Sequence, residues 1–182
     1  LFAPVVTTLV AVAVVWRYLL HSRYGLINHG LAQLGIDPVD WLGDPLWAMP
    51  AIALMSVWKN FGYNMIILLA GLQMIPKSLY EAAEVDGASK WQQFWQITIP
   101  MLMPSIIVAL IFRTITALQT FDIPYTMTKG GPGNATETLA MLIHKTTIDY
   151  LDVGYGSTLA VCMFVLSLVV TAFYLKRIGR NA

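Results

Sequence analysis

The stretch Ser157–Leu175 reads STLAVCMFVLSLVVTAFYL and carries no charged side chain. A hydrocarbon core about 30 Å thick requires about 20 predominantly apolar residues in a helix, so this stretch predicts a transmembrane helix. The composition of the whole chain agrees with that prediction. Of its 182 residues, 57% are hydrophobic and 12% are charged, whereas soluble domains carry about 25% charged residues. We therefore predict an integral membrane protein.

Three more stretches of the chain are apolar and long enough to cross a bilayer. They cover residues 1–20, about 46–75 and about 104–126, and with 157–175 they make four predicted spans. The expected fold is an all-α, polytopic transmembrane helical bundle in which residues 1–182 form one domain. Because the sequence opens inside an apolar stretch and without Met, we expect further spans before it.

Positive charges give a first indication of orientation. Lys176, Arg177 and Arg180 follow the last span directly, and cationic residues beside a span are retained in the cytoplasm. Alternation then places the loop 76–103 inside. The bias over the whole chain is weak, with five Lys and Arg inside against four outside, so the orientation needs support from another observation.

The loop 76–103 predicts two short helices joined by a corner. Residues 79–85 are good helix formers, and Asp86-Gly87 ends that helix because glycine adopts the left-handed cap without steric cost. Ser89 with Gln92 three residues later has the spacing of a capping box, which opens the second helix.

Two interpretations of this loop follow from its residues alone. Ala82, Ala83 and Gly87 are small, so another protein surface could approach the first helix closely. Alternatively, the loop is amphipathic and rests on lipid headgroups, with Trp91 and Trp95 as interface anchors.

The spacing in this loop resembles the EAA motif of membrane subunits of ATP-binding-cassette (ABC) importers. Glu81-Ala82-Ala83 is followed by Gly87 and then, nine residues on, by Ile97-Thr98-Ile99-Pro100, where the family usually has Leu in place of Ile99. Further segments are similar to the carbohydrate-uptake branch, which includes permeases for maltose, other oligosaccharides and glycerol-3-phosphate. These segments are Trp41–Pro45, Val57–Lys59, Ala70–Gln73, Val85–Ala88, Phe121-Asp122 and Gly130–Gly133.

The resemblance implies a fold, a location and a set of partners. The fold is the ABC importer permease fold, of which this chain resembles the C-terminal four of about six spans. The EAA loop of that family is cytoplasmic, which supports the orientation, and the membrane is the inner membrane of a bacterium or archaeon. The partners are cytoplasmic ATPase subunits, a second permease subunit, an extracytoplasmic solute-binding protein and membrane lipid.

The same resemblance implies a mechanism. The loop couples transport of a sugar or oligosaccharide to the ATPase subunits, and the residues implied in that contact are Glu81, Ala82, Ala83, Asp86 and Gly87. The chain needs no cofactor of its own, because ATP and Mg are bound by the partner ATPase subunits. It is not an enzyme.

Polar residues at membrane depth are candidates for the substrate pathway, because such groups require protein or water beside them. They concentrate in the two middle spans: Lys59, Asn60, Tyr63, Asn64, Arg113, Gln119 and Asp122. Two readings stay open for the ions among them. Arg113 is either a donor to sugar hydroxyls or a structural ion paired with neighbouring spans. Lys59 and Asp122 lie at similar heights, so they could pair with each other or line the outer cavity.

Other classes of function have less support in the sequence. A net charge of +1 offers no field to attract nucleic acid. The three histidines, His21, His29 and His144, lack metal-ligand spacing, so we expect no metal site. No catalytic constellation is visible, although a polytopic membrane enzyme, a channel or a scaffold remains an alternative class. Within the family, the alternative is a permease for another solute such as glycerol-3-phosphate or a polyamine.

Overall fold

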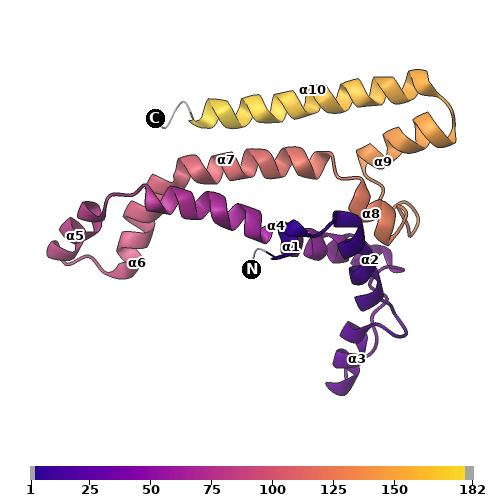
Figure 1. Ribbon diagram of the computed structural model, residues 1–182, viewed down its shortest axis with the longest axis horizontal. Coiled ribbons are helices and arrows are strands. Elements are labelled where there is room, and N and C mark those ends of the chain that lie inside the picture. The colour runs from indigo at the N-terminus through magenta and orange to yellow at the C-terminus, as the bar shows by residue number, and fades with distance from the viewer. Residues whose placement is uncertain (1–2, 179–182) are drawn as a thin grey trace. The chain divides into compact units, whose positions relative to one another are not determined.

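The computed structural model describes residues 3–178, and every regular element in that range is a helix. Figure 1 shows their order along the chain. The elements are α1 (Ala3–Val6), α2 (Leu9–Leu19), α3 (Leu26–Gln33), α4 (Pro45–Gln73), α5 (Lys77–Val85), α6 (Lys90–Gln93), the π-helical turn η1 (Phe94–Thr98), α7 (Ile99–Leu118), α8 (Asp122–Met127), α9 (Leu139–His144), the π-helical turn η2 (Lys145–Asp149) and α10 (Val153–Ile178). The all-α fold class is confirmed.

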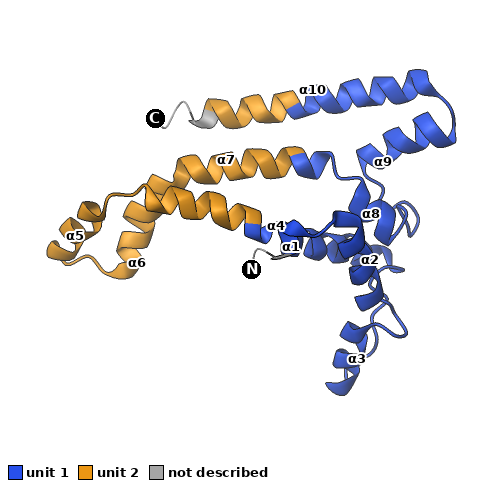
Figure 2. Cartoon of the chain, viewed as in Figure 1, with its two compact units in different colours: residues 1–62, 116–167 blue, residues 63–115, 168–182 orange. Residues whose placement is uncertain are grey.

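The chain forms two compact units, drawn in different colours in Figure 2. Unit 1 comprises Leu1–Gly62 and Thr116–Ser167, and unit 2 comprises Tyr63–Ile115 and Leu168–Ala182. Three long helices, α4, α7 and α10, begin in one unit and end in the other.

Within residues 3–178, three helices are long and apolar enough to cross a membrane. They are Pro45–Gln73, the continuous helix Lys90–Leu118 made by α6, η1 and α7, and Val153–Lys176. They overlap the second, third and fourth predicted spans. The third span extends further toward the N-terminus than expected, because the capping box at Ser89 starts the helix and π-helical turns carry it through to α7.

This third helix also ends earlier than the expected residue 126. α7 stops at Leu118, and a separate short helix, α8, starts at Asp122. Pro124 lies in the first turn of α8, where a residue without an N–H is tolerated. Thr120 donates its hydroxyl to the Thr116 carbonyl at 2.9 Å within the last turn.

The predicted first span, residues 1–20, is not one continuous helix over the part that the structure describes. α1 ends at Val6, Thr8 is extended (φ −66°, ψ 139°), and α2 has only eleven residues. Such a helix is about 16 Å long, which is half of a hydrocarbon core. Thr7 donates its hydroxyl to the Pro4 carbonyl at 2.7 Å, a local bond that competes with continuation of the helix.

The core of unit 1 lies where α2 packs on α4 and α8. Eight buried side chains form this cluster: Val12, Ala13, Leu20, Ala51, Ile52, Met55, Ile123 and Met127. Trp16 and Trp58 add an aromatic contact between α2 and α4, with ring centroids 5.6 Å apart. One face of the short helix α2 is therefore covered by protein of its own unit, whereas Val10, Val14 and Val15 on its other side are about half exposed.

In unit 2, α4 and α7 approach closely at a glycine. A Cβ built on Gly71 would lie 2.2 Å from Ser105 Oγ and 2.8 Å from Leu102 Cδ1. Small residues at such contacts let two membrane helices pack backbone against side chain. The loop 76–103 connects α4 to α7, and these two helices are thus tightly packed next to that loop.

Candidate functional site

The corner between α5 and α6 has the geometry of a Schellman cap. Gly87 takes a positive φ of 75°, the Ala88 amide donates to the Ala83 carbonyl at 2.9 Å, and the Gly87 amide donates to the Glu84 carbonyl at 3.1 Å. A Cβ at Gly87 would meet no atom within 4 Å. Glycine is therefore required here by the backbone conformation and not by lack of space.

The second half of the corner confirms the predicted capping box. The Ser89 amide donates to Gln92 Oε1 at 2.8 Å, and the Gln92 amide donates to Ser89 Oγ at 3.3 Å. These reciprocal bonds satisfy two amides that the first turn of α6 leaves without helical partners.

Three further contacts fasten α5 to the start of the following helix. Tyr80 Oη and Thr98 Oγ1 are 2.9 Å apart. Gln93 is buried and donates its amide to the Ala88 carbonyl at 3.2 Å. Glu84 forms an ion pair with Lys90 across the corner, and that lysine holds the pKa of the Glu84 carboxyl below its usual range.

The candidate coupling residues lie on the exposed part of this element. Glu81, Ala82, Asp86 and Gly87 are exposed, and Ala83 is half-buried. The corner thus presents two carboxylates beside small side chains, held by a rigid cap. Such a surface admits close approach by another protein. Its role stays a prediction.

Lys59 is buried, with 7% of its surface exposed. Its ammonium bonds the segment in which the predicted first span is interrupted, between α1 and α2. Nζ donates to the Thr7 carbonyl at 2.5 Å and also to the Pro4 carbonyl. Both carbonyls belong to the end of α1 and the break behind it, where helical partners are missing. This arrangement favours a structural role for Lys59 over the pairing with Asp122, which is exposed in the first turn of α8.

The other candidate pathway residues divide between the units. Asn60 belongs to unit 1 and donates its amide to the Ser56 carbonyl of its own helix at 2.7 Å. Tyr63 is half exposed, and Asn64 and Arg113 are partly buried, all three in unit 2. The pathway assignment of these residues stays a prediction.

Gln119 lies in unit 1 and lines a cavity of about 340 Å³. The rest of the lining comes from α9 and α10 and is mostly apolar: Ala140, Ile143, Ala160, Met163, Phe164 and Ser167. Pockets for small molecules span about 300–1,000 Å³ and combine apolar walls with a few polar groups. Among the predicted pathway residues, Gln119 lines this cavity.

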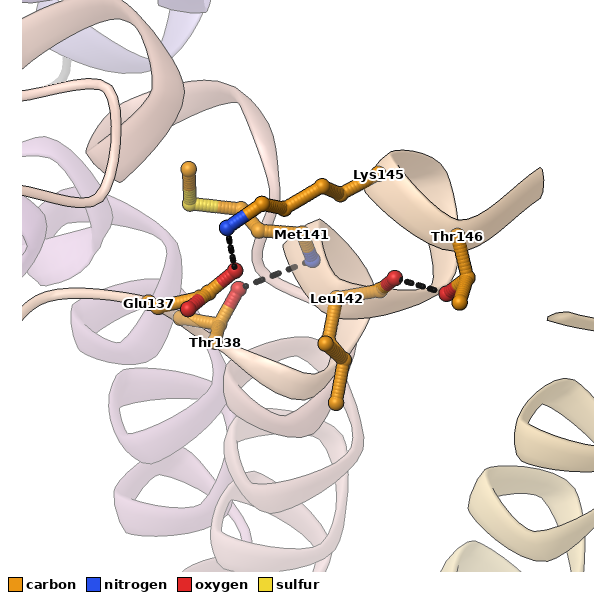
Figure 3. A network of polar contacts seen from close by, with 6 residues as sticks. All are labelled: Glu137, Thr138, Met141, Leu142, Lys145 and Thr146. Carbon is orange, nitrogen blue, oxygen red and sulfur yellow. Dashed lines mark hydrogen bonds and ion pairs between the residues drawn. The ribbon is translucent and has the colours of Figure 1, made fainter. Parts of the chain in front are cut away.

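A polar network around α9 was not predicted from the sequence. Figure 3 shows Glu137 and Lys145 paired, with Nζ 3.4 Å from Oε1, beside the start of the helix. This contact raises the pKa of Lys145. Thr138 caps α9 by accepting from the Met141 amide at 3.3 Å, and it donates to the Thr120 carbonyl at 2.8 Å. A Thr directly before an apolar run is the signal that could have revealed this cap.

The loop between α8 and α9 is a glycine-rich turn. Gly130 and Gly133 have positive φ angles of 86° and 55°. Thr136 is fully buried, donates to the Gly131 carbonyl at 2.8 Å and lies 2.6 Å from the hydroxyl of Thr128. The hydroxyls of the turn are thus used to fix its backbone.

Long apolar helices, two of them joined by a capped helix–corner–helix loop, indicate an integral membrane protein. Comparison with known families agrees. The chain belongs to the family described as binding-protein-dependent transport system inner membrane component, which matches residues 1–177. It is therefore an integral protein of the inner membrane.

Named relatives of the chain are sugar transport permeases. It is 57% identical to the sulfoquinovosyl glycerol transport system permease protein SmoG of Agrobacterium fabrum, over 89% of this chain and 53% of that protein. It is 48% identical to the trehalose/maltose transport system permease protein MalF of Thermococcus litoralis, over 91% of this chain and 55% of that protein. The chain thus spans about half the length of these relatives.

Two solved structures share the fold. Both are of a bacterial alginate ABC transporter, and one of them is in complex with an alginate pentasaccharide-bound periplasmic protein. The chains compared have 27% sequence identity, with TM-scores of 0.86 and 0.89 over 95% and 98% of this chain and 60% and 63% of those chains. The resemblance of the sequence to ABC importer permeases is confirmed.

Proposed function

We propose that this chain belongs to the permease subunit of an ABC importer, lines the translocation pathway for a sugar or oligosaccharide, and contacts an ATPase subunit through α5 and the Gly87 corner. The observation that carries the coupling role is the corner itself. An exposed helix of small and acidic residues ends in a rigid cap, and its residues have the EAA spacing.

The proposed partners follow from this role. Cytoplasmic ATPase subunits bind ATP and Mg and supply the energy, while an extracytoplasmic protein delivers the solute and a second permease subunit completes the pathway. This chain contributes no catalytic group and no cofactor. The family name supports the dependence on a binding protein, and the relatives named above support a sugar over glycerol-3-phosphate or a polyamine.

Two substitutions at one position test the coupling role. Gly87→Val opposes the left-handed backbone through its β-branch, whereas Gly87→Asn tolerates it. We expect Gly87→Val to abolish transport and to uncouple ATP hydrolysis in the reconstituted transporter, with membrane insertion intact. Gly87→Asn should retain most of both activities. Normal transport by Gly87→Val would refute the coupling role of this corner.

A second experiment tests the solute class independently of the corner. The purified transporter is reconstituted in proteoliposomes that contain ATP, and its binding protein is added. Uptake of labelled disaccharides, glycerol-3-phosphate and a polyamine is then compared. Uptake restricted to a saccharide supports the proposal. Uptake restricted to the phosphate ester or the polyamine would overturn the solute class and leave the coupling role standing.

A further inference from the structure

Three aromatic rings form an exposed cluster at the start of the helix Lys90–Leu118. Trp91, Phe94 and Trp95 have 71%, 40% and 53% of their surfaces exposed. Their ring centroids lie 5.4–6.1 Å apart, so each ring contacts the other two. A contiguous apolar surface of this kind requires a partner.

The loop itself does not provide that partner. The side of the helix that faces the loop is occupied by Gln93, which is buried against Ala88, and by Thr98, which bonds Tyr80. The aromatic cluster is therefore left outside the contacts that hold the loop together.

The position of the cluster along the helix indicates what covers it. α7 has twenty residues, from Ile99 to Leu118, and at about 1.5 Å per residue it matches a hydrocarbon core about 30 Å thick. Trp95 precedes Ile99 by four residues and Trp91 by eight, which places them about 6 and 12 Å beyond the core. Bilayers measure about 40–45 Å with both polar layers, which leaves about 5–7.5 Å for the headgroup layer on each side. The backbone of Trp95 lies within that layer, and the backbone of Trp91 lies just beyond it, on its aqueous side.

The chemistry of the cluster fits the same layer. Tryptophan combines an apolar ring with an N–H donor and is enriched at the membrane–water interface. Gln92 and Gln96 beside the rings are exposed amides that can bond headgroups. The charge of Lys90 is already engaged by Glu84, so attraction to anionic lipid is not the main contribution.

We propose that Trp91, Phe94 and Trp95 are an interfacial anchor that binds the headgroup layer of the adjacent leaflet. One loop then carries two surfaces: α5 and the Gly87 corner are free for a protein partner, while the aromatic face of α6 and η1 rests in lipid. The anchor requires only that Lys90–Leu118 crosses the membrane, and it does not depend on the solute or on the ATPase contact.

Nitroxide labels in the assembled transporter test this assignment. Single cysteines replace Trp91, Trp95 and Val85 in turn on a Cys162→Ser background with partner cysteines removed, and the labelled transporter is placed in phosphatidylcholine nanodiscs. Collision with oxygen, which is concentrated in lipid, is compared with collision with a water-soluble nickel chelate. Val85→Cys is the matched control, because Val85 is apolar and 88% exposed but lies on α5. It is measured with the ATPase subunits removed, because α5 is the proposed ATPase contact.

We expect the oxygen-to-nickel ratio at position 95 to exceed that at position 85 about threefold or more, with position 91 in between, as depth increases toward the apolar span. Removal of the ATPase subunits should leave the ratios at 91 and 95 unchanged, and replacing half the lipid by an anionic lipid should do the same. The anchor is refuted if labels at 91 and 95 collide freely with the nickel chelate, or if they become accessible only when the ATPase subunits are removed.

Labels at Gln92 and Gln96 keep the test valid if a tryptophan variant fails to assemble. These positions leave all three rings in place, and they lie near the depths of Trp91 and Trp95. Position 96 carries the test, because Gln92→Cys also removes the capping bond from the Ser89 amide. Position 96 should then show the higher oxygen-to-nickel ratio of the two. Equal exposure of both to the nickel chelate would place the cluster in water and overturn the proposal.

Discussion

Lys59 holds the backbone of Thr7, 52 residues away in the sequence, through a hydrogen bond of 2.5 Å from its ammonium to the Thr7 carbonyl. The same ammonium also bonds the Pro4 carbonyl. A helix end carries a partial negative charge, so a cation at this place stabilises the break between α1 and α2. A buried lysine at membrane depth is thereby accounted for by these two carbonyls and the Thr7 hydroxyl, 3.4 Å from its ammonium.

Replacing Lys59 with Met should destabilise unit 1, because two carbonyls lose a charged donor in a buried place. Hydrogen bonds to charged groups contribute about 1.5–3 kcal/mol, and we expect a loss of that size. Thermal unfolding of the transporter in detergent measures it. Lys77→Met, at an exposed position, should change the midpoint little, and equal shifts for both variants would contradict the clamp.

Gly71→Ala should loosen the contact of α4 and α7, because its Cβ would lie 2.2 Å from Ser105 Oγ. Overpacking at such a contact costs about 1–3 kcal/mol. Gly30→Ala is the matched control in α3, where a Cβ meets no atom within 4 Å, and it should stabilise by about 0.5–1 kcal/mol. Unfolding midpoints that move in opposite directions support the contact, and a stabilised Gly71→Ala variant would disprove it.

The ion pair of Glu84 and Lys90 predicts a dependence of the corner on pH. Lys90 lowers the pKa of the Glu84 carboxyl from its ordinary 4.5, so the pair stabilises the corner at pH values above the ordinary pKa. That stabilisation is lost as the pH falls through the lowered pKa, when the carboxylate is protonated. Carboxyl titration by NMR should give a higher pKa for Glu84 in Lys90→Met than in the parent. Identical titration curves would show that the pair does not form in solution.

Gln119 and Tyr63 test the pathway assignment. We expect Gln119→Ala and Tyr63→Phe to weaken sugar-stimulated transport by about 1–3 kcal/mol, the cost of leaving a buried hydrogen-bonding partner unpaired. Cysteine labelling from the aqueous side, with and without substrate, should show protection at positions 63, 64 and 119. Protection restricted to α10 would instead place the path along the last helix.

The orientation also has a direct test. A reporter enzyme that is active only outside the cytoplasm should be silent when fused after Ala182 and active when inserted in the turn Gly130–Asn134. Two observations give this expectation. Cationic residues follow α10, and the EAA loop of the family is cytoplasmic. The opposite pattern would overturn the orientation and, with it, the ATPase contact.

The corner could be predicted from the sequence because its chemistry is local. Gly87 as a left-handed cap and Ser89 with Gln92 as a capping box involve residues within three positions of each other, and both are confirmed. The break at Thr7 was not predicted. Two of its carbonyls accept from Lys59 more than fifty residues away, while the bond from Thr7 to Pro4 is local to residues 1–20.

The end of the third span at Leu118 was also not predicted. Pro124 lies in the predicted span 104–126, but prolines also lie inside the continuous helices α4 and α7, at Pro50 and Pro104, so a proline in this span does not by itself indicate the stop at Leu118. The pairing of Glu137 with Lys145 and the bond from Thr138 to Thr120 join segments eight and eighteen residues apart. These contacts depend on the exact backbone conformation of the turn between the segments. The glycines of the sequence indicate a turn there, but they do not specify that conformation.

The π-helical turn η1 has one more consequence for the long helix that contains it. A π turn holds one residue more than an α turn, so it advances the angular phase of the helix by about 100°. A face traced along α6 therefore does not continue as the same face of α7. Relaxing Phe94–Thr98 to ordinary α-helix with no residue removed would rotate the whole loop about the axis of α7 by about that angle and redirect every surface it carries. Deleting one residue there would instead remove the π turn and keep the direction of the loop.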